Sequence, residues 1–126
     1  MLKIEEGVIY LTRGDDAVID VQLTIQDGGA YEMQPGDTVT LTVRELPKEE
    51  SEIILDSSSA PGSNRIIINS ADTENAEVGQ YSADIELLTE DGKRYTVWPD
   101  LEGSGRYKTG NMKNFVIMPE VTMSEH

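Results

Sequence analysis

Few residues in this chain could carry out catalysis. A serine or cysteine nucleophile needs an ordered imidazole or another base beside it. The sequence has no cysteine, and its only histidine is the last residue, His126. Its 24 acidic side chains must include some close pairs, so a paired-carboxylate hydrolase is the one catalytic arrangement that composition leaves open. We find no nucleophile–base pair to propose, and we expect a protein that is not an enzyme and needs no cofactor.

Two acidic turns offer oxygen ligands to a metal ion. Asp15-Asp16 and Glu90-Asp91 each place carboxylates side by side, as Ca²⁺ prefers. Neither turn has the spacing of an EF-hand loop, and acidic turns usually face water, so we expect no metal site. Arg13-Gly14-Asp15 matches an integrin-binding tripeptide, but a turn that needs glycine is the simpler interpretation.

The net charge of −14 restricts the possible partners. It opposes the phosphates of nucleic acids and the surface of anionic membranes. The charge is uneven, because residues 1–92 hold 20 acidic and 5 basic side chains, whereas residues 93–126 hold 4 acidic and 5 basic. The simpler explanation of this uneven charge is a charged surface that keeps the protein soluble. The functional alternative is a polarised module whose acidic surface docks against a basic surface of a copy or a neighbour.

Alternation of apolar and polar residues predicts that strands position these groups. We expect one short helix, within Ser70–Val78 and capped by Ser70 or Asp72. Ile66–Ile68 is apolar on both faces, which is typical of a strand inside a sandwich. The other predicted strands are Val8–Thr12, Ala17–Ile25, Thr38–Arg44, Ile53–Leu55, Gly79–Thr89, a strand ending before Pro99, and Asn114–Met118. Tyr31–Met33 is expected to be a short extended piece.

These elements predict an all-β fold, an antiparallel immunoglobulin-like β-sandwich of 7–8 strands with one short helical turn. A small barrel is the alternative. The 126 residues suit a single domain, in which 98–114 form a long basic loop and 119–126 a tail.

Tyr81 is expected to fix the start of the longest strand. Gly79 precedes it by two residues, and Tyr81, Ala83, Ile85 and Leu87 share one face. This arrangement is similar to the tyrosine corner of immunoglobulin-like sandwiches, in which the phenol bonds to the preceding backbone. We therefore expect Tyr81 to be buried and its hydroxyl to bond to backbone near residues 72–78.

The turn at Asp91-Gly92 allows two registers. A two-residue loop would place Leu88 opposite Tyr95. A three-residue loop, Glu90-Asp91-Gly92 with Gly92 left-handed, places Leu87 opposite Tyr95 and Ile85 opposite Val97. A slip of one residue reverses the face of every side chain, so burial favours the three-residue loop.

The order of these motifs along the chain resembles that in a known protein family. Thr12 to Asp16 leads into an alternating strand, Pro35 to Val39 leads into another, and Gly79-Gln80-Tyr81 and Asp91-Gly92 follow. Over about residues 8–121, this order is similar to the immunoglobulin-like N-terminal module of baseplate upper proteins, and to related short structural proteins, of phages and prophages of Gram-positive bacteria.

The resemblance implies a non-enzymatic phage or prophage structural protein, made in the bacterial host cytoplasm and placed in the baseplate or tail of the virion. Its partners would be other phage structural proteins or copies of itself, with no nucleic acid and no membrane. Longer members carry a receptor-binding region after this module. This sequence ends at His126, which favours an attachment or accessory role.

A cell-surface or carbohydrate-binding β-sandwich is the second interpretation. Trp98 and Tyr107 lie near basic residues and could form a platform for sugar rings. Packing of Trp98 at the edge of the sandwich is the simpler explanation. A surface module would also be expected to carry a signal peptide or an anchor, yet Met1–Glu6 has acidic residues where a signal peptide needs an apolar run.

The long basic loop is the predicted contact surface. It holds Arg106, Lys108 and Lys113, and Trp98 and Tyr107 could supply the aromatic anchors that interfaces favour. Loops of this length in small domains are often functional or disordered, and a loop without function is the alternative.

We predict that Arg106→Ala/Lys108→Ala weakens association with copies of the chain or with a structural partner at low salt. The reason is the loss of charge pairing, which salt also weakens, since the screening length is ~3 Å at 1 M. Light scattering at low and high salt measures the effect, and assembly that neither salt nor the substitutions change contradicts it.

Overall fold

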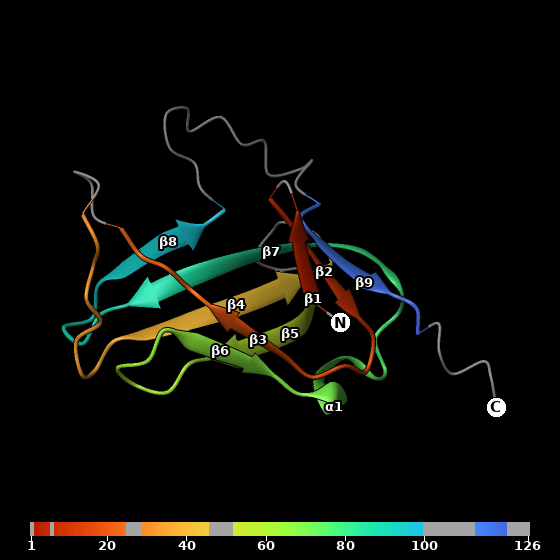
Figure 1. Ribbon diagram of the computed structural model, residues 1–126, viewed down its shortest axis with the longest axis horizontal. Helices are drawn as coiled ribbons and strands as arrows, with labels where there is room; N and C mark the ends of the chain where they lie inside the picture. Colours follow the sequence, from red (N-terminus) through yellow and green to blue (C-terminus); the bar gives the residue numbers. More distant parts are fainter. Residues whose placement is uncertain (1, 6, 25–28, 46–51, 100–112, 121–126) are drawn as a thin grey trace.

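The computed structural model describes residues 2–5, 7–24, 29–45, 52–99 and 113–120. These residues form nine strands and one short helix (Figure 1). In chain order they are β1 (Leu2–Glu5), β2 (Val8–Thr12), β3 (Ala17–Asp20), β4 (Thr38–Arg44), β5 (Ile53–Ser58), β6 (Arg65–Ile68), α1 (Ser70–Thr73), β7 (Gly79–Leu88), β8 (Arg94–Trp98) and β9 (Phe115–Met118).

The strands form two sheets, as an all-β sandwich requires. The large sheet has the order β1-β2-β9-β7-β4-β5, and β8 also pairs with β7. The small sheet consists of β3 and β6. In Figure 1 β3 crosses in front of β4, and β6 contacts β4 and β5, so the small sheet packs against this part of the large one.

Alternation of side chains builds the core between the sheets. Val39, Leu41 and Val43 of β4 are fully buried, as predicted, and the intervening threonines are not. Burial continues to alternate after β3 ends, because Val21 and Leu23 are buried while Gln22 and Thr24 are exposed. The other large apolar side chains that are fully buried are Ile9, Leu11, Ile66, Ile68, Phe115 and Ile117.

The sheet differs from the predicted one in strand number and direction. Nine strands replace the expected 7–8, and β1 is an additional strand that pairs antiparallel with β2 after a turn at Gly7, whose φ is +79°. The pair β2–β9 is parallel, so the sheet is mixed rather than wholly antiparallel. Tyr31–Met33, predicted as a short extended piece, forms no strand.

Two local predictions around β6 and α1 were wrong. Ile67 is 52% exposed, because β6 is covered on one face only and has no sheet on its other side. The residue that caps α1 is Asn69 rather than Ser70 or Asp72. Asp72 instead accepts the backbone N–H of Asn69 at 2.8 Å, so the carboxylate closes the first turn from inside the helix.

Strand β7 changes its partner along one edge. Gly79–Tyr81 pairs with β9, whereas Ile85–Leu88 pairs with β8. Ala83 lies between the two segments and has no strand opposite it on that side. The side chain of Asn114 takes that place, since its Oδ1 accepts the Ala83 N–H at 2.8 Å and its Nδ2 donates to the Ala83 carbonyl at 3.0 Å. One amide side chain therefore substitutes for a strand at the position where β8 and β9 separate.

The predicted role of Tyr81 is confirmed. Its ring is 6% exposed, and its hydroxyl donates to the carbonyl of Glu77 at 2.5 Å. This bond fixes the chain between α1 and β7 against the start of the strand. An added Cβ at Gly79 would meet nothing within 4 Å, so space does not require glycine at that position.

We predict that Asn114→Ala lowers the free energy of unfolding by about 1–3 kcal/mol, the cost of leaving a buried backbone group without a partner. Asn114→Asp should also destabilise at neutral pH, because a carboxylate accepts the Ala83 N–H but cannot donate to its carbonyl. Urea unfolding followed by circular dichroism measures both. Wild-type stability in the alanine variant would show that the amide is dispensable.

Tyr81→Phe removes only the hydroxyl and keeps the buried ring. We expect a loss of about 0.5–1.5 kcal/mol in the free energy of unfolding, the net value of one hydrogen bond. Tyr95→Phe is the matched control, since Tyr95 is 51% exposed and should tolerate the change. Equal losses of unfolding free energy in the two variants would show that the Tyr81 hydroxyl bond does not stabilise the fold.

Candidate binding groove

The β7–β8 hairpin forms one wall of the candidate site, and its register beside the turn is the predicted one. Leu87 lies opposite Tyr95, and the Thr89 N–H donates to the Lys93 carbonyl at 2.8 Å around a three-residue loop. Gly92 has a φ of +94°, in the left-handed region that favours glycine. The Gly92 N–H donates to the Thr89 carbonyl at 2.9 Å, which closes the turn.

One part of the predicted register was wrong. Ile85 lies opposite Trp98 rather than Val97, because a β-bulge interrupts the pairing between Ile85 and Glu86. The bulge places one extra residue in β8, which bends an edge strand and changes the direction of its side chains. Val97 and Trp98 are both half-buried and pack against the core.

Asp37 holds the opposite wall against this hairpin. Its side chain is fully buried, and its Oδ1 accepts the Glu90 N–H at 2.9 Å. Its Oδ2 accepts the Tyr31 hydroxyl at 2.5 Å and the Gln34 N–H at 2.9 Å. The Glu90 carboxylate in turn accepts the Gly36 N–H at 3.2 Å. A single carboxylate therefore joins the segment before β4 to the β7–β8 turn.

These hydrogen bonds change the acidity of both partners. Hydrogen bonding from Tyr31, and then from the Gln34 N–H, lowers the pKa of Asp37. The hydrogen bond to Asp37, with burial, raises the pKa of Tyr31 to about 12. Tyr31 is therefore a neutral donor and Asp37 an ionised acceptor at neutral pH.

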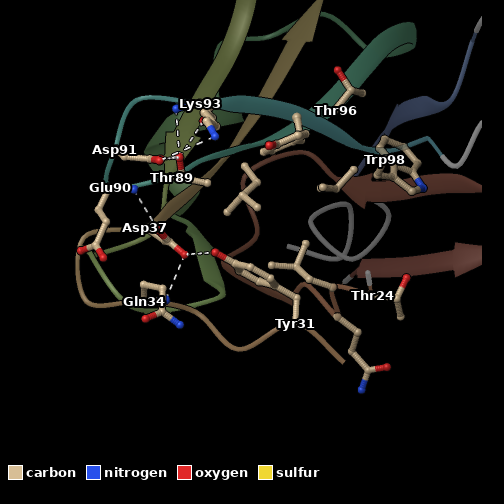
Figure 2. A pocket seen from close by; sticks show the side chains of 15 residues that line it. Thr24, Tyr31, Gln34, Asp37, Thr89, Glu90, Asp91, Lys93, Thr96 and Trp98 are labelled. Carbon is tan, nitrogen blue, oxygen red and sulfur yellow. Dashed lines mark hydrogen bonds and ion pairs between the residues drawn. The ribbon is translucent and has the colours of Figure 1, made fainter. Parts of the chain in front are cut away.

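An open groove of about 1130 Å³ lies between these two walls. Figure 2 shows Trp98 at one end and Asp91 with Lys93 at the other, with Tyr31 along the facing wall. Tyr95 also lines the groove. Buried Leu23 and Leu87 contribute apolar surface, and the remaining contributors are mainly polar side chains.

The groove lies beside β8, which makes no extensive contact with either strand of the small sheet. Tyr95 lies opposite the buried Leu87, and directly opposite residues share a face of the sheet. Leu87 is nonetheless 5% exposed and Tyr95 51%. Of this cross-strand pair only Leu87 is buried, and about half of Tyr95 remains exposed.

The structure brings together few of the predicted interaction residues. Trp98 lines the groove, and Lys113 is exposed just before β9. Arg106, Tyr107 and Lys108 lie outside the described residues, as does nearly all of the predicted basic loop. Sequence reasoning missed Tyr31, Asp37 and Tyr95 as members of one site. The Pro35-Gly36-Asp37 turn was visible, but nothing in its spacing pointed to Glu90.

The acidic turns and the integrin-type tripeptide have structural partners. The Asp16 carboxylate accepts the Ser70 N–H at 2.7 Å, and the Asp91 carboxylate accepts the Thr89 hydroxyl. Arg13 Nη2 contacts Glu120 at 2.9 Å, and Gly14 has a φ of +82°. Among the described residues no group of three or more acidic or histidine side chains could hold a metal ion. No helix in that part of the chain is long and apolar enough to cross a membrane.

Comparison with protein-family models, with curated proteins and with solved structures finds no match to this chain.

We predict that Asp37→Asn reduces the acid sensitivity of the fold. A carboxylate whose folded pKa is lowered stabilises the fold above its ordinary pKa near 3.8, and this contribution is lost as pH falls through the folded pKa. Asp37→Asn should therefore be less stable than wild type at pH 6. Its free energy of unfolding should also change less between pH 6 and pH 3 than that of wild type. Urea unfolding at both pH values measures this.

Asp56→Asn is the matched control, because it removes one negative charge from an exposed position on β5. The prediction fails if the free energy of unfolding changes by the same amount between pH 6 and pH 3 in Asp37→Asn and in Asp56→Asn.

Proposed function

We propose that this chain is a non-enzymatic attachment module that acts through protein–protein contacts in the baseplate or tail of a phage or prophage particle. The order of turn and strand motifs supports the assignment to a particle, and the all-β sandwich is compatible with it. Cysteine is absent, which rules out a Cys-His site, and the only histidine, His126, lies outside the described residues.

The observation that carries the proposal is an exposed apolar pair on the small sheet. Val18 of β3 lies directly opposite Ile67 of β6, and the two side chains are 46% and 52% exposed. Single exposed aliphatic residues are common, but two that adjoin across strands form a continuous patch on a strongly acidic protein. Asp20 and Arg65, joined at 2.9 Å, flank the patch with one charge of each sign.

We take the occupant of this face to be another structural protein of the same particle rather than a second copy. The net charge of −14 opposes self-association, because like-charged surfaces repel each other. A partner of lower or opposite charge would bring an apolar surface to Val18 and Ile67 without that repulsion. The flanking Asp20 and Arg65 could then fix its orientation.

Val18→Lys/Ile67→Glu tests this face without changing the net charge. An oppositely charged cross-strand pair should preserve the sheet while removing its apolar surface. We expect the wild-type chain, co-expressed with the proteins encoded beside it, to form a complex that this variant loses. Size-exclusion chromatography with light scattering measures the complex.

Val78→Ser is the control, since Val78 is another exposed aliphatic residue, at 46%, and lies outside the small sheet. A wild-type chain that remains monomeric with every protein encoded beside it contradicts the proposal. So does a complex that survives Val18→Lys/Ile67→Glu.

A further inference from the structure

The groove beside β8 has an aromatic lining that the attachment function does not use. Tyr31 lies along one wall, and Tyr95 and Trp98 come from β8 on the other. Tyr95 is 51% exposed although it shares a sheet face with buried Leu87. A large aromatic ring that stays half-exposed on a core-directed face is a candidate binding surface.

We propose that this groove binds a neutral oligosaccharide. Sugar rings present C–H faces that stack on aromatic rings, and their hydroxyl groups both donate and accept hydrogen bonds. The groove offers both kinds of contact, because Gln22, Gln34, Asp91 and Lys93 contribute polar groups to the same lining as the aromatic rings. A lining of apolar walls with a few polar groups is typical of small-molecule sites.

The charge of the lining selects a neutral ligand. Asp37, Glu90 and Asp91 are acidic, and Lys93 is the one basic residue among the lining residues that the structure describes. Lys93 Nζ also lies 4.0 Å from Asp91, which partly offsets its charge. A nucleic acid or an acidic polysaccharide would meet a lining with more acidic than basic side chains here.

The length of the groove favours several linked sugar rings over one. Its β8 wall runs from the turn at Lys93 to Trp98, about 16 Å in extended conformation. The groove is also pre-formed, since Asp37 holds Tyr31 through a 2.5 Å hydrogen bond. Ring positions that are fixed before binding reduce the entropy lost on association.

Polar groups in the lining remain available to a ligand. Within the part of the chain that the structure describes, neither the Gln22 side chain nor the Trp98 indole N–H has a hydrogen-bond partner. Gln34 Nε2 donates to the Glu32 carbonyl at 3.0 Å, which leaves the side-chain oxygen Oε1 to accept from a hydroxyl.

Trp98 allows a direct test because it is the only tryptophan in the chain. Its fluorescence is followed while cellotetraose, maltotetraose and chitotetraose are titrated as neutral probes, with a tetramer of galacturonic acid as the anionic probe. We expect at least one neutral probe to shift the emission of Trp98 and the anionic probe to have no effect.

Tyr95→Ala and Tyr10→Ala form the matched pair of variants. Tyr95 is half-exposed in the groove, whereas Tyr10 lies on β2 near Lys3, outside the groove lining. We expect Tyr95→Ala to weaken binding by about ten-fold or more, as loss of a stacking ring does, and Tyr10→Ala to leave affinity unchanged. Gln22→Ala gives a second groove variant at an exposed position that should fold normally.

Three outcomes would overturn the proposal. One is the absence of any Trp98 response to all three neutral probes at millimolar concentration. Another is an equal loss of affinity in Tyr95→Ala and Tyr10→Ala. The third is a Trp98 response only to an extended peptide of alternating valine and threonine, which would make the groove a peptide site.

Discussion

The side-chain amide of Asn114 is the contact on which the arrangement of the large sheet depends. Ala83 needs a donor and an acceptor opposite its backbone, and Asn114 supplies both from a single buried side chain. A buried backbone N–H or carbonyl without a partner is costly. Asn114 removes this cost at Ala83, which lies between the segment of β7 that pairs with β9 and the segment that pairs with β8. With Asn114 in place, β9 pairs with the first part of β7 and β8 with the last part.

The separation of β8 from β9 determines what the protein exposes. β8 is attached to the sheet through β7 and carries a bulge opposite Ile85, and its core-directed face extends beyond the small sheet. The buried carboxylate of Asp37 then holds Tyr31 across from it. The pairing of β8 with β7 forms one aromatic wall of the groove, and the hydrogen bonds of Asp37 hold Tyr31 in the other. The exposed Val18–Ile67 pair lies on the outer face of the small sheet, so the two proposed surfaces are independent.

Sequence periodicity predicted the strands that bury alternating side chains against the core. The bounds of β2 and β4 agree with the prediction, as do the Tyr81 corner and the Gly92 turn, because each depends on residues close in sequence. Periodicity could not reveal Asn114, which acts through one side chain bonded 31 residues away. It also missed the parallel pairing of β2 with β9, because the same apolar alternation is compatible with parallel and antiparallel neighbours.

The candidate site was predicted only in part, for a related physical reason. Trp98 was identified by its residue type, but its position opposite Ile85 depends on a bulge that alternation does not encode. Asp37 was predicted as a turn residue, yet its bond to the Glu90 N–H joins segments 53 residues apart. Long-range hydrogen bonds of this kind require the fold, whereas turns and caps require only the local sequence.

Amide hydrogen exchange at Ala83 tests the central claim most directly. The claim is that the Asn114 side chain replaces a strand at the point where β7 changes partner. We predict that the Ala83 N–H exchanges as slowly as those of Tyr81 and Ile85, which have a strand opposite them. Exchange at the rate of amides in exposed turns would show that Asn114 does not hold this position, and would contradict the account.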